Sequence, residues 1–110
     1  MKVQTAVTRL SALAQESRLA IFRLLVQRGP EGLSAGEIAS KLKVAPNTLS
    51  FHLKELSNAK LLNSRQEGRF VFYAADFEAM NDLLSYLTEH CCADSSAGNH
   101  CAAPTTCKES

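Results

Sequence analysis

The segment from Ser34 to Leu62 constrains the fold most, because it has the pattern of two short helices joined by a tight turn. Ser34 is followed three residues later by Glu37, a capping box that predicts the start of the first helix. Pro46 ends that helix and suits the first turn of the next one, since its φ is fixed near the helical value and it has no N–H. The second helix has an apolar stripe at spacings of four and three residues, formed by Leu49, Leu53 and Leu56. This pattern is typical of a helix-turn-helix.

The other sides of the second helix carry small polar side chains and a lysine, which suits the major groove of DNA. We therefore expect it to be a recognition helix, with Lys54 on phosphates and its other outward residues on base edges. The predicted base contacts are Asn47, Thr48, Ser50, Phe51 and His52. Phe51 can touch a thymine methyl but cannot hydrogen-bond, and His52 has a second interpretation as a packing residue.

The formal net charge of +1 hides an asymmetry along the chain. Residues 34–69 contain six Lys and Arg against three Asp and Glu, a balance of +3, whereas residues 76–110 contain one against six, a balance of −5. The basic part coincides with the predicted helix-turn-helix, where DNA phosphates would be met. The charge supports a nucleic-acid partner only in combination with the motif, because +3 alone also fits an ordinary surface.

The remaining patterns predict three further helices and a β-hairpin. The helix signals are an amphipathic stretch from Val3 to Leu13, a Ser17 cap followed by apolar residues up to Gly29, and an Asp76 cap followed by apolar residues up to Leu87. Between the helix-turn-helix and the last helix, residues 61–65 and the aromatic, β-branched run 70–73 flank a turn at residues 66–69 that contains a glycine, which predicts a hairpin.

A chain of 110 residues builds one modest core, which in small domains is often completed by oligomerisation. We expect residues 1–92 to form one winged helix-turn-helix domain for DNA binding and dimerisation, and residues 93–110, where the periodicity stops, a flexible cysteine-containing tail. No apolar run approaches the roughly 20 residues needed to span a bilayer, and the N-terminus lacks the apolar block of a signal peptide. We therefore expect a cytoplasmic protein without a membrane partner.

Three motifs resemble the ArsR/SmtB family of bacterial repressors, and they occur in the family's order. LAQESRLAIFRLL (13–25) is similar to the family's LADPTRLRILRLL opening, NTLSFHLKEL (47–56) to its STVSHHLKVL recognition helix, and RQEGRFVFY (65–73) to its REGRxxxY wing. The resemblance covers about residues 8–90 and implies a mainly α winged helix-turn-helix with a small β-hairpin as the wing. One departure is Lys60, where the family usually has a glycine that tolerates a left-handed conformation.

The resemblance also implies a homodimer through the first and fifth helices, double-stranded operator DNA as the partner, and phosphate contacts for Arg65 and Arg69 of the wing. A two-fold protein matches a palindromic operator. The composition supports the dimer independently, because a single small domain has too little interior to bury all the apolar residues of those two helices. The alternative is that these residues complete the core of a monomer. They are Leu10, Leu13, Met80, Leu83, Leu84 and Leu87.

All four cysteines lie within the last 20 residues, at Cys91, Cys92, Cys101 and Cys107. Disulfides are disfavoured in a reducing cytoplasm, so clustered thiols in a tail suggest capture of a soft ion. The pattern resembles an arsenical-resistance subgroup of the family with a Cys-Cys pair at the end of the fifth helix and a further Cys in the tail. The resemblance implies As(III) or Sb(III) as the inducer that releases the repressor from DNA.

Trivalent arsenic makes three bonds, which three thiolates satisfy, and we assign these to Cys91, Cys92 and Cys101, with Cys107 as the spare. Cys101 needs the shorter loop closure, but the entropic difference is small, so Cys107 in the third position is an alternative. Zn(II) or cadmium remains an alternative, because four cysteines, or cysteines with a nearby histidine, can complete a tetrahedral site. A thiol-redox switch is a second alternative.

An enzyme has no support, since the chain has no Gly-rich phosphate loop, no metalloprotease helix and no ordered Cys-His-Asp set. A winged helix used only for protein contacts is a further alternative, which specific retention on a DNA palindrome would exclude.

Overall fold

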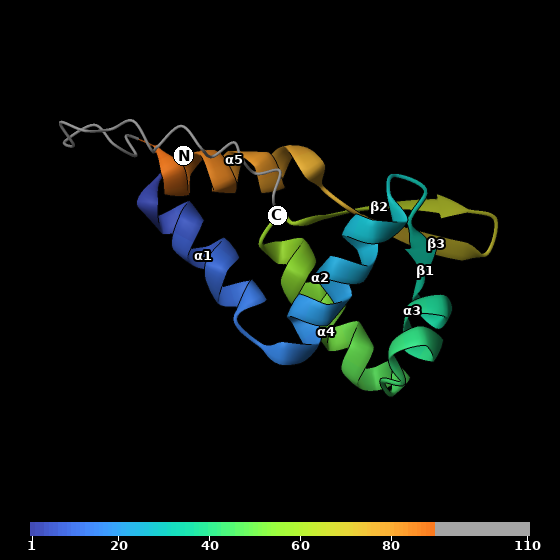
Figure 1. Ribbon diagram of the computed structural model, residues 1–110. Coiled ribbons are helices and arrows are strands. Elements are labelled where there is room, and N and C mark those ends of the chain that lie inside the picture. Colours follow the sequence, from blue (N-terminus) through green and yellow to red (C-terminus); the bar gives the residue numbers. More distant parts are fainter. Residues whose placement is uncertain (90–110) are drawn as a thin grey trace, which may run out of the picture.

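The structure, a computed structural model, describes residues 1–89, which form five helices and a three-stranded sheet at one end (Figure 1). The helices are α1 (Val3–Leu13), α2 (Glu16–Arg28), α3 (Ala35–Leu42), α4 (Pro46–Asn58) and α5 (Phe77–Thr88), and the strands are β1 (Leu33–Ser34), β2 (Leu62–Glu67) and β3 (Phe70–Ala75). The mainly α winged helix-turn-helix predicted from the sequence is confirmed. Along residues 1–89, no helix is long and apolar enough to cross a membrane.

The predicted helix starts of the helix-turn-helix and of α5 are confirmed in atomic detail. The Glu37 backbone N–H donates to Ser34 Oγ at 3.2 Å, and the Ser34 N–H donates to Glu37 Oε1 at 2.9 Å, so the capping box is complete. This backbone hydrogen bond from Ser34 lowers the pKa of Glu37. Pro46 is the first residue of α4, and Asp76 caps α5 by accepting the Ala79 N–H at 3.0 Å.

The start of α2 differs from the prediction. Gln15, rather than Ser17, is the N-cap: its backbone is extended, and its side-chain oxygen accepts the Arg18 N–H at 2.9 Å. Ser17 lies inside the first turn of the helix. Two candidate caps two residues apart are not separated by sequence pattern alone, because either can supply an oxygen to the free N–H groups.

The sheet has the order β1-β3-β2, with both pairings antiparallel. Strands β2 and β3 form the predicted hairpin, and its turn consists of Gly68 and Arg69, between the paired Glu67 and Phe70. Gly68 has a φ of 63°, which a two-residue hairpin turn needs at its first position. The pairing of β1 with β3 was not predicted, and it attaches the wing to the residue that caps α3, since Ser34 pairs with Phe72.

The core lies where α2, α3 and α4 meet the base of the hairpin. Burying a large apolar side chain completely stabilises the fold by about 1.5–3 kcal/mol relative to leaving it exposed. The largest fully buried side chains are Ile21, Leu25, Ile38, Leu49, Leu56 and Leu61. After α4 the chain turns at Lys60, whose φ is 66°, so this lysine has the left-handed conformation that the family's usual glycine tolerates.

Candidate DNA-binding surface

The turn between α3 and α4 is built from three residues, 43–45. Lys43 has a left-handed φ of 56°, and the Val44 N–H donates to the Ala39 carbonyl oxygen at 3.1 Å, which ends α3. Ala45 is extended and leads into Pro46. The turn therefore packs α4 against α3 with the leucine stripe of α4 inward, since Leu49, Leu53 and Leu56 are 3% exposed or less.

Most of the residues predicted to contact bases lie on the outward side of α4. Phe51 is 55% exposed, so its ring is available to another molecule on this side of the helix. Lys54 lies one turn further along the helix and is exposed as well. The outward side of α4 consists of Asn47, Thr48, Ser50, Phe51 and Lys54.

The predicted base contact of His52 is wrong, because its side chain is buried. His52 is 7% exposed, and its Nδ1 lies 3.4 Å from Nη1 of Arg18 on α2. Burial lowers the pKa of His52, and the positive charge of Arg18 lowers that pKa further, so the neutral imidazole is favoured. His52 is therefore a packing residue, as its second interpretation predicts.

The two wing arginines differ in their surroundings. Arg65 is tied to the protein on three sides: its Nε lies 2.6 Å from Oε2 of Glu67, its Nη1 donates to the Glu31 carbonyl oxygen at 2.9 Å, and its guanidinium lies 5.0 Å from the centre of the Phe72 ring. Arg69 lies exposed in the turn, and its side chain makes no hydrogen bond or ion pair with the rest of residues 1–89. The geometry thus favours Arg69 for a phosphate contact and makes Arg65 a brace of the wing.

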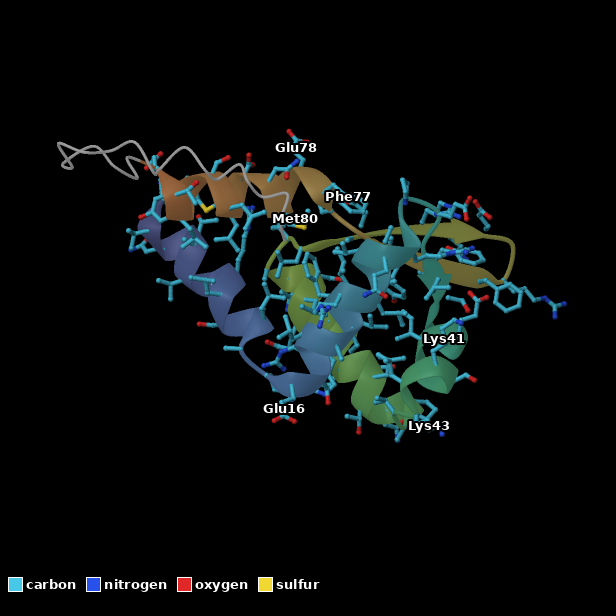
Figure 2. All side chains as sticks on the ribbon, in the orientation of Figure 1. Glu16, Lys41, Lys43, Phe77, Glu78 and Met80 are labelled. Atoms are coloured by element: carbon cyan, nitrogen blue, oxygen red, sulfur yellow. The ribbon has the colours of Figure 1, made fainter. Side chains whose placement is uncertain are left out.

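Two basic side chains near the turn were counted in the net charge but not assigned to the site. Lys41 is in the last turn of α3, Lys43 is its C-cap, and both are exposed. Figure 2 shows them at the α3 end of the molecule, on the opposite side from Glu78 of α5. Their position directly before the recognition helix was the available signal, because a helix N-terminus and nearby lysines both attract phosphate.

A second, apolar surface lies on α1 and α5, away from the helix-turn-helix (Figure 1). The exposed apolar residues of α1 are spaced by four and three, which places them on one side of that helix. Their exposed fractions range from 40% to 61%, and those of the two exposed leucines of α5 are 52% and 53%. The apolar surface consists of Val3, Val7, Leu10, Leu84 and Leu87.

The four cysteines predicted to bind metal, Cys91, Cys92, Cys101 and Cys107, lie outside the described residues, as does the predicted tail of residues 93–110. Within residues 1–89, no group of three or more His, Cys, Asp or Glu side chains is placed to hold a metal ion. Helix α5 ends at Thr88 with Glu89 as its C-cap, so in the sequence the Cys91-Cys92 pair begins two residues after that cap.

Comparison with known proteins gives one family and several relatives. Residues 13–65 match the helix-turn-helix domain family. The transcriptional activator HlyU of Vibrio cholerae is 39% identical over 85 residues, which cover 74% of this chain and 76% of HlyU. The solved structure of that protein has a TM-score of 0.63 at 37% identity, and the match covers 79% of this chain and 97% of the other.

Two further relatives are an arsenical regulator and a structure known as a dimer. The arsenical resistance operon repressor of Bacillus subtilis is 36% identical over 81 residues, which cover 74% of this chain and 73% of that one. The homodimeric winged helix-turn-helix domain of Mb0332 from Mycobacterium bovis has a TM-score of 0.66 at 24% identity, covering 81% of this chain and 87% of the other, and shows the fold alone.

Proposed function

Because the chain belongs to the ArsR/SmtB family of winged helix-turn-helix transcriptional regulators, we propose that it is a homodimeric repressor released from operator DNA by trivalent arsenic or antimony. Its relatives are transcriptional regulators, and the chain is a regulator rather than an enzyme. The observation that carries the choice of inducer is that all four cysteines follow α5 in the sequence, with Cys91 and Cys92 close to its end. We place this repressor in the cytoplasm, where operator DNA and a reducing environment are both found.

The dimer is supported by the apolar surface on α1 and α5. Val3 and Val7 on one side of α1 and Leu84 on α5 are each more than half exposed, and repeated apolar exposure along one side of a helix favours a partner more than single exposures do. A second copy is the simplest partner, because a two-fold axis applies the same surface twice. Mb0332, which shares the fold, is described as homodimeric.

DNA binding is assigned to the outward side of α4, the lysines before it and the wing tip. In this proposal Ser50, Phe51 and their outward neighbours meet base edges in the major groove, while Lys54 and Arg69 meet phosphates. A dimer presents two such helices to the two halves of a palindrome.

The inducer is assigned to Cys91, Cys92 and Cys101, with Cys107 as the spare thiol. Three thiolates match the three bonds of As(III) or Sb(III), and a soft ion prefers sulfur over oxygen or nitrogen. The sequence relationship to a repressor named for arsenical resistance supports this choice. Because α5 is also part of the proposed dimer surface, binding next to its end can change the separation of the two recognition helices.

Two other inducers fit the same thiols. Zn(II) or cadmium would use four ligands, and oxidation would join two thiols without any metal. The relative HlyU is named as an activator without reference to arsenic, so family membership alone does not select the inducer.

The decisive experiment titrates the full chain, bound to a duplex that it enriches from a random-sequence pool, with arsenite, antimonite, zinc and peroxide. We expect arsenite or antimonite to release the duplex and zinc or peroxide to leave it bound. The variants Cys91→Ser, Cys92→Ser and Cys101→Ser should keep DNA affinity but lose release, because a hydroxyl is a far less acidic and harder donor than a thiol. Cys107→Ser is the matched control and should respond like the wild type.

Release of the Cys91→Ser, Cys92→Ser double variant by arsenite would show that the thiol site is assigned incorrectly. Release by peroxide alone, reversed by a reductant, would identify a redox switch. Release by zinc with tetrahedral coordination in X-ray absorption would identify the zinc alternative.

A further inference from the structure

Arg18 joins the end of α1 to the recognition helix. Its Nε donates to the Ala12 carbonyl oxygen in the last turn of α1 at 2.8 Å, and its Nη1 lies 3.4 Å from Nδ1 of His52 on α4. Its own backbone N–H donates to the cap residue Gln15 at 2.9 Å, which fixes where the side chain begins. Arg18 of α2 thus contacts the end of α1 and the middle of α4.

The local chemistry explains why an arginine occupies this position. The Ala12 carbonyl is one of the last four of α1, which have no partner within the helix, and α1 has no basic residue in its last turn. The guanidinium supplies both a donor and a positive charge at that end, where the helix dipole is negative. In its own helix, Arg18 lies in the first turn, where a cation is disfavoured. Its position is therefore explained by the contacts to α1 and α4 and not by α2.

The contact with His52 defines the state of the imidazole. Arginine only donates hydrogen bonds, so Nδ1 must carry the lone pair and the proton must be on Nε2. A second proton would place two cations next to each other in a site where His52 is 7% exposed. The neutral ring thus acts as the acceptor that receives Arg18.

Helices α1 and α4 contact each other directly, and beside these contacts lies a groove that Arg18 lines. The groove, of about 350 Å³, separates the two helices along part of their length, with Val7 and Ser11 of α1 on one side and Glu55 and Asn58 of α4 on the other. Here Arg18 and Glu55 are the charged lining groups, and Arg18 is hydrogen-bonded to both helix α1 and helix α4.

We propose that Arg18 is a positioning residue for DNA recognition, which holds α4 at a fixed place relative to α1 through Ala12 and His52. The outward side of α4 then meets the major groove in the correct register without a contact between Arg18 and DNA. In the proposed dimer, α1 is part of the interface, and the same contacts transmit a movement of α1 to α4. This transmission rests on the proposed function.

The test compares affinity for the duplex enriched by the wild type with affinity for a scrambled duplex of the same composition. Arg18→Lys keeps the charge but loses the planar fork, and His52→Leu loses the acceptor. Each should lower affinity for the enriched duplex about five- to tenfold, the range of one lost hydrogen bond, and change affinity for the scrambled duplex less than about twofold. The double variant should be no weaker than either single one, because both remove the same contact.

Two matched controls separate positioning from general damage. His52→Asn keeps an acceptor near the position of Nδ1 and should restore wild-type affinity, and Arg23→Lys, an exposed residue of the same helix, should change nothing. Equal losses on both duplexes, or single effects that multiply in the double variant, would overturn the inference.

The outcomes for the proposed function and for Arg18 are distinguishable. If arsenite releases the wild type, the factor by which arsenite lowers DNA affinity should be smaller in Arg18→Lys. If arsenite does not release the wild type, the proposed inducer is wrong, and the comparison of the two duplexes still decides the role of Arg18. If the wild type enriches no duplex, DNA recognition itself is wrong. Amide hydrogen exchange of α4 then decides: faster exchange in Arg18→Lys but not in Arg23→Lys supports positioning, and equal rates overturn it.

Discussion

Arg65 and Glu67 lie two residues apart on the same face of β2, and their side chains form an ion pair with Nε and Oε2 at 2.6 Å. The Arg65 guanidinium also donates to the carbonyl oxygen of Glu31. The Glu31 side chain in turn pairs with Arg28 of α2, with Nη2 and Oε1 at 3.1 Å. The base of the wing is thus connected to the end of α2 through side chains as well as through the sheet.

We predict that replacing the two wing arginines has different effects on DNA binding. Arg69→Ala should weaken binding to all duplexes and reduce the slope of log affinity against log salt by about 1, because one phosphate contact is lost. Arg65→Ala should leave that slope nearly unchanged and act on the wing instead, and Glu67→Gln should reproduce part of its effect. Affinity measured at several salt concentrations checks this. A larger slope change for Arg65→Ala than for Arg69→Ala would contradict the assignment.

The outward side of α4 should determine sequence choice. Ser50→Ala should lower affinity for the enriched duplex by about 1–3 kcal/mol and affinity for a scrambled duplex much less, because a base contact exists only at the correct sequence. Phe51→Ala should relax the preference for thymine at one position in each half-site, which a repeated selection from the random pool would reveal. Unchanged selection by both variants would place base readout elsewhere.

The buried imidazole of His52 should make stability depend on pH. Its pKa is lowered by burial and then by the charge of Arg18, so the unfolded chain takes up a proton at a higher pH than the folded chain does. Above pH 7 this group contributes no pH dependence; as the pH falls below about 6.5, the free energy of unfolding decreases until the folded-state pKa has been passed. Urea denaturation between pH 8 and pH 5 should show this decrease in the wild type and a smaller one in His52→Asn. Parallel curves for the two proteins would disprove it.

Two glycines should respond in opposite ways to alanine. Gly32 has a φ of 74°, and a Cβ there would lie 2.4 Å from the Tyr73 carbonyl oxygen, so Gly32→Ala should lower the free energy of unfolding by about 2 kcal/mol or more. Gly36 lies in α3 with open space around it, and Gly36→Ala should raise that free energy by up to about 1 kcal/mol. Thermal unfolding of both variants tests the pair. A stable Gly32→Ala would mean that β3 can move away from this loop.

The sequence predicted the elements whose signals are local. Caps, prolines and turn glycines act on neighbouring residues, so the structure at each could be inferred without the rest of the fold. Here they are the capping box of Ser34 and Glu37, Pro46, Asp76 and Gly68. The two-residue strand β1 has too few residues for a periodic signal and became visible only through its partner β3. Its existence depends on a pairing across almost 40 residues.

What the sequence missed in the candidate site also comes from distant partners. The hydrogen bond between Arg65 and the Glu31 carbonyl was not predicted, because it spans 34 residues. For His52 a signal was present: positions 49, 52, 53 and 56 share one side of a helix, so the residue lies at the edge of the leucine stripe. Its polarity favoured the outward interpretation, and only the nearby Arg18 made burial acceptable.

The pairing of β1 ends at Ser34 and Phe72, two residues short of Phe70, where β3 begins. The hairpin beyond this point is a two-stranded projection on a three-stranded base, and Phe70, 61% exposed, lies next to its turn. Residues of the projection can be exchanged, or the turn lengthened, without touching the pairing that fixes the base. In the proposed DNA complex, the reach of the wing is therefore a property that can change independently of the pairing that folds its base.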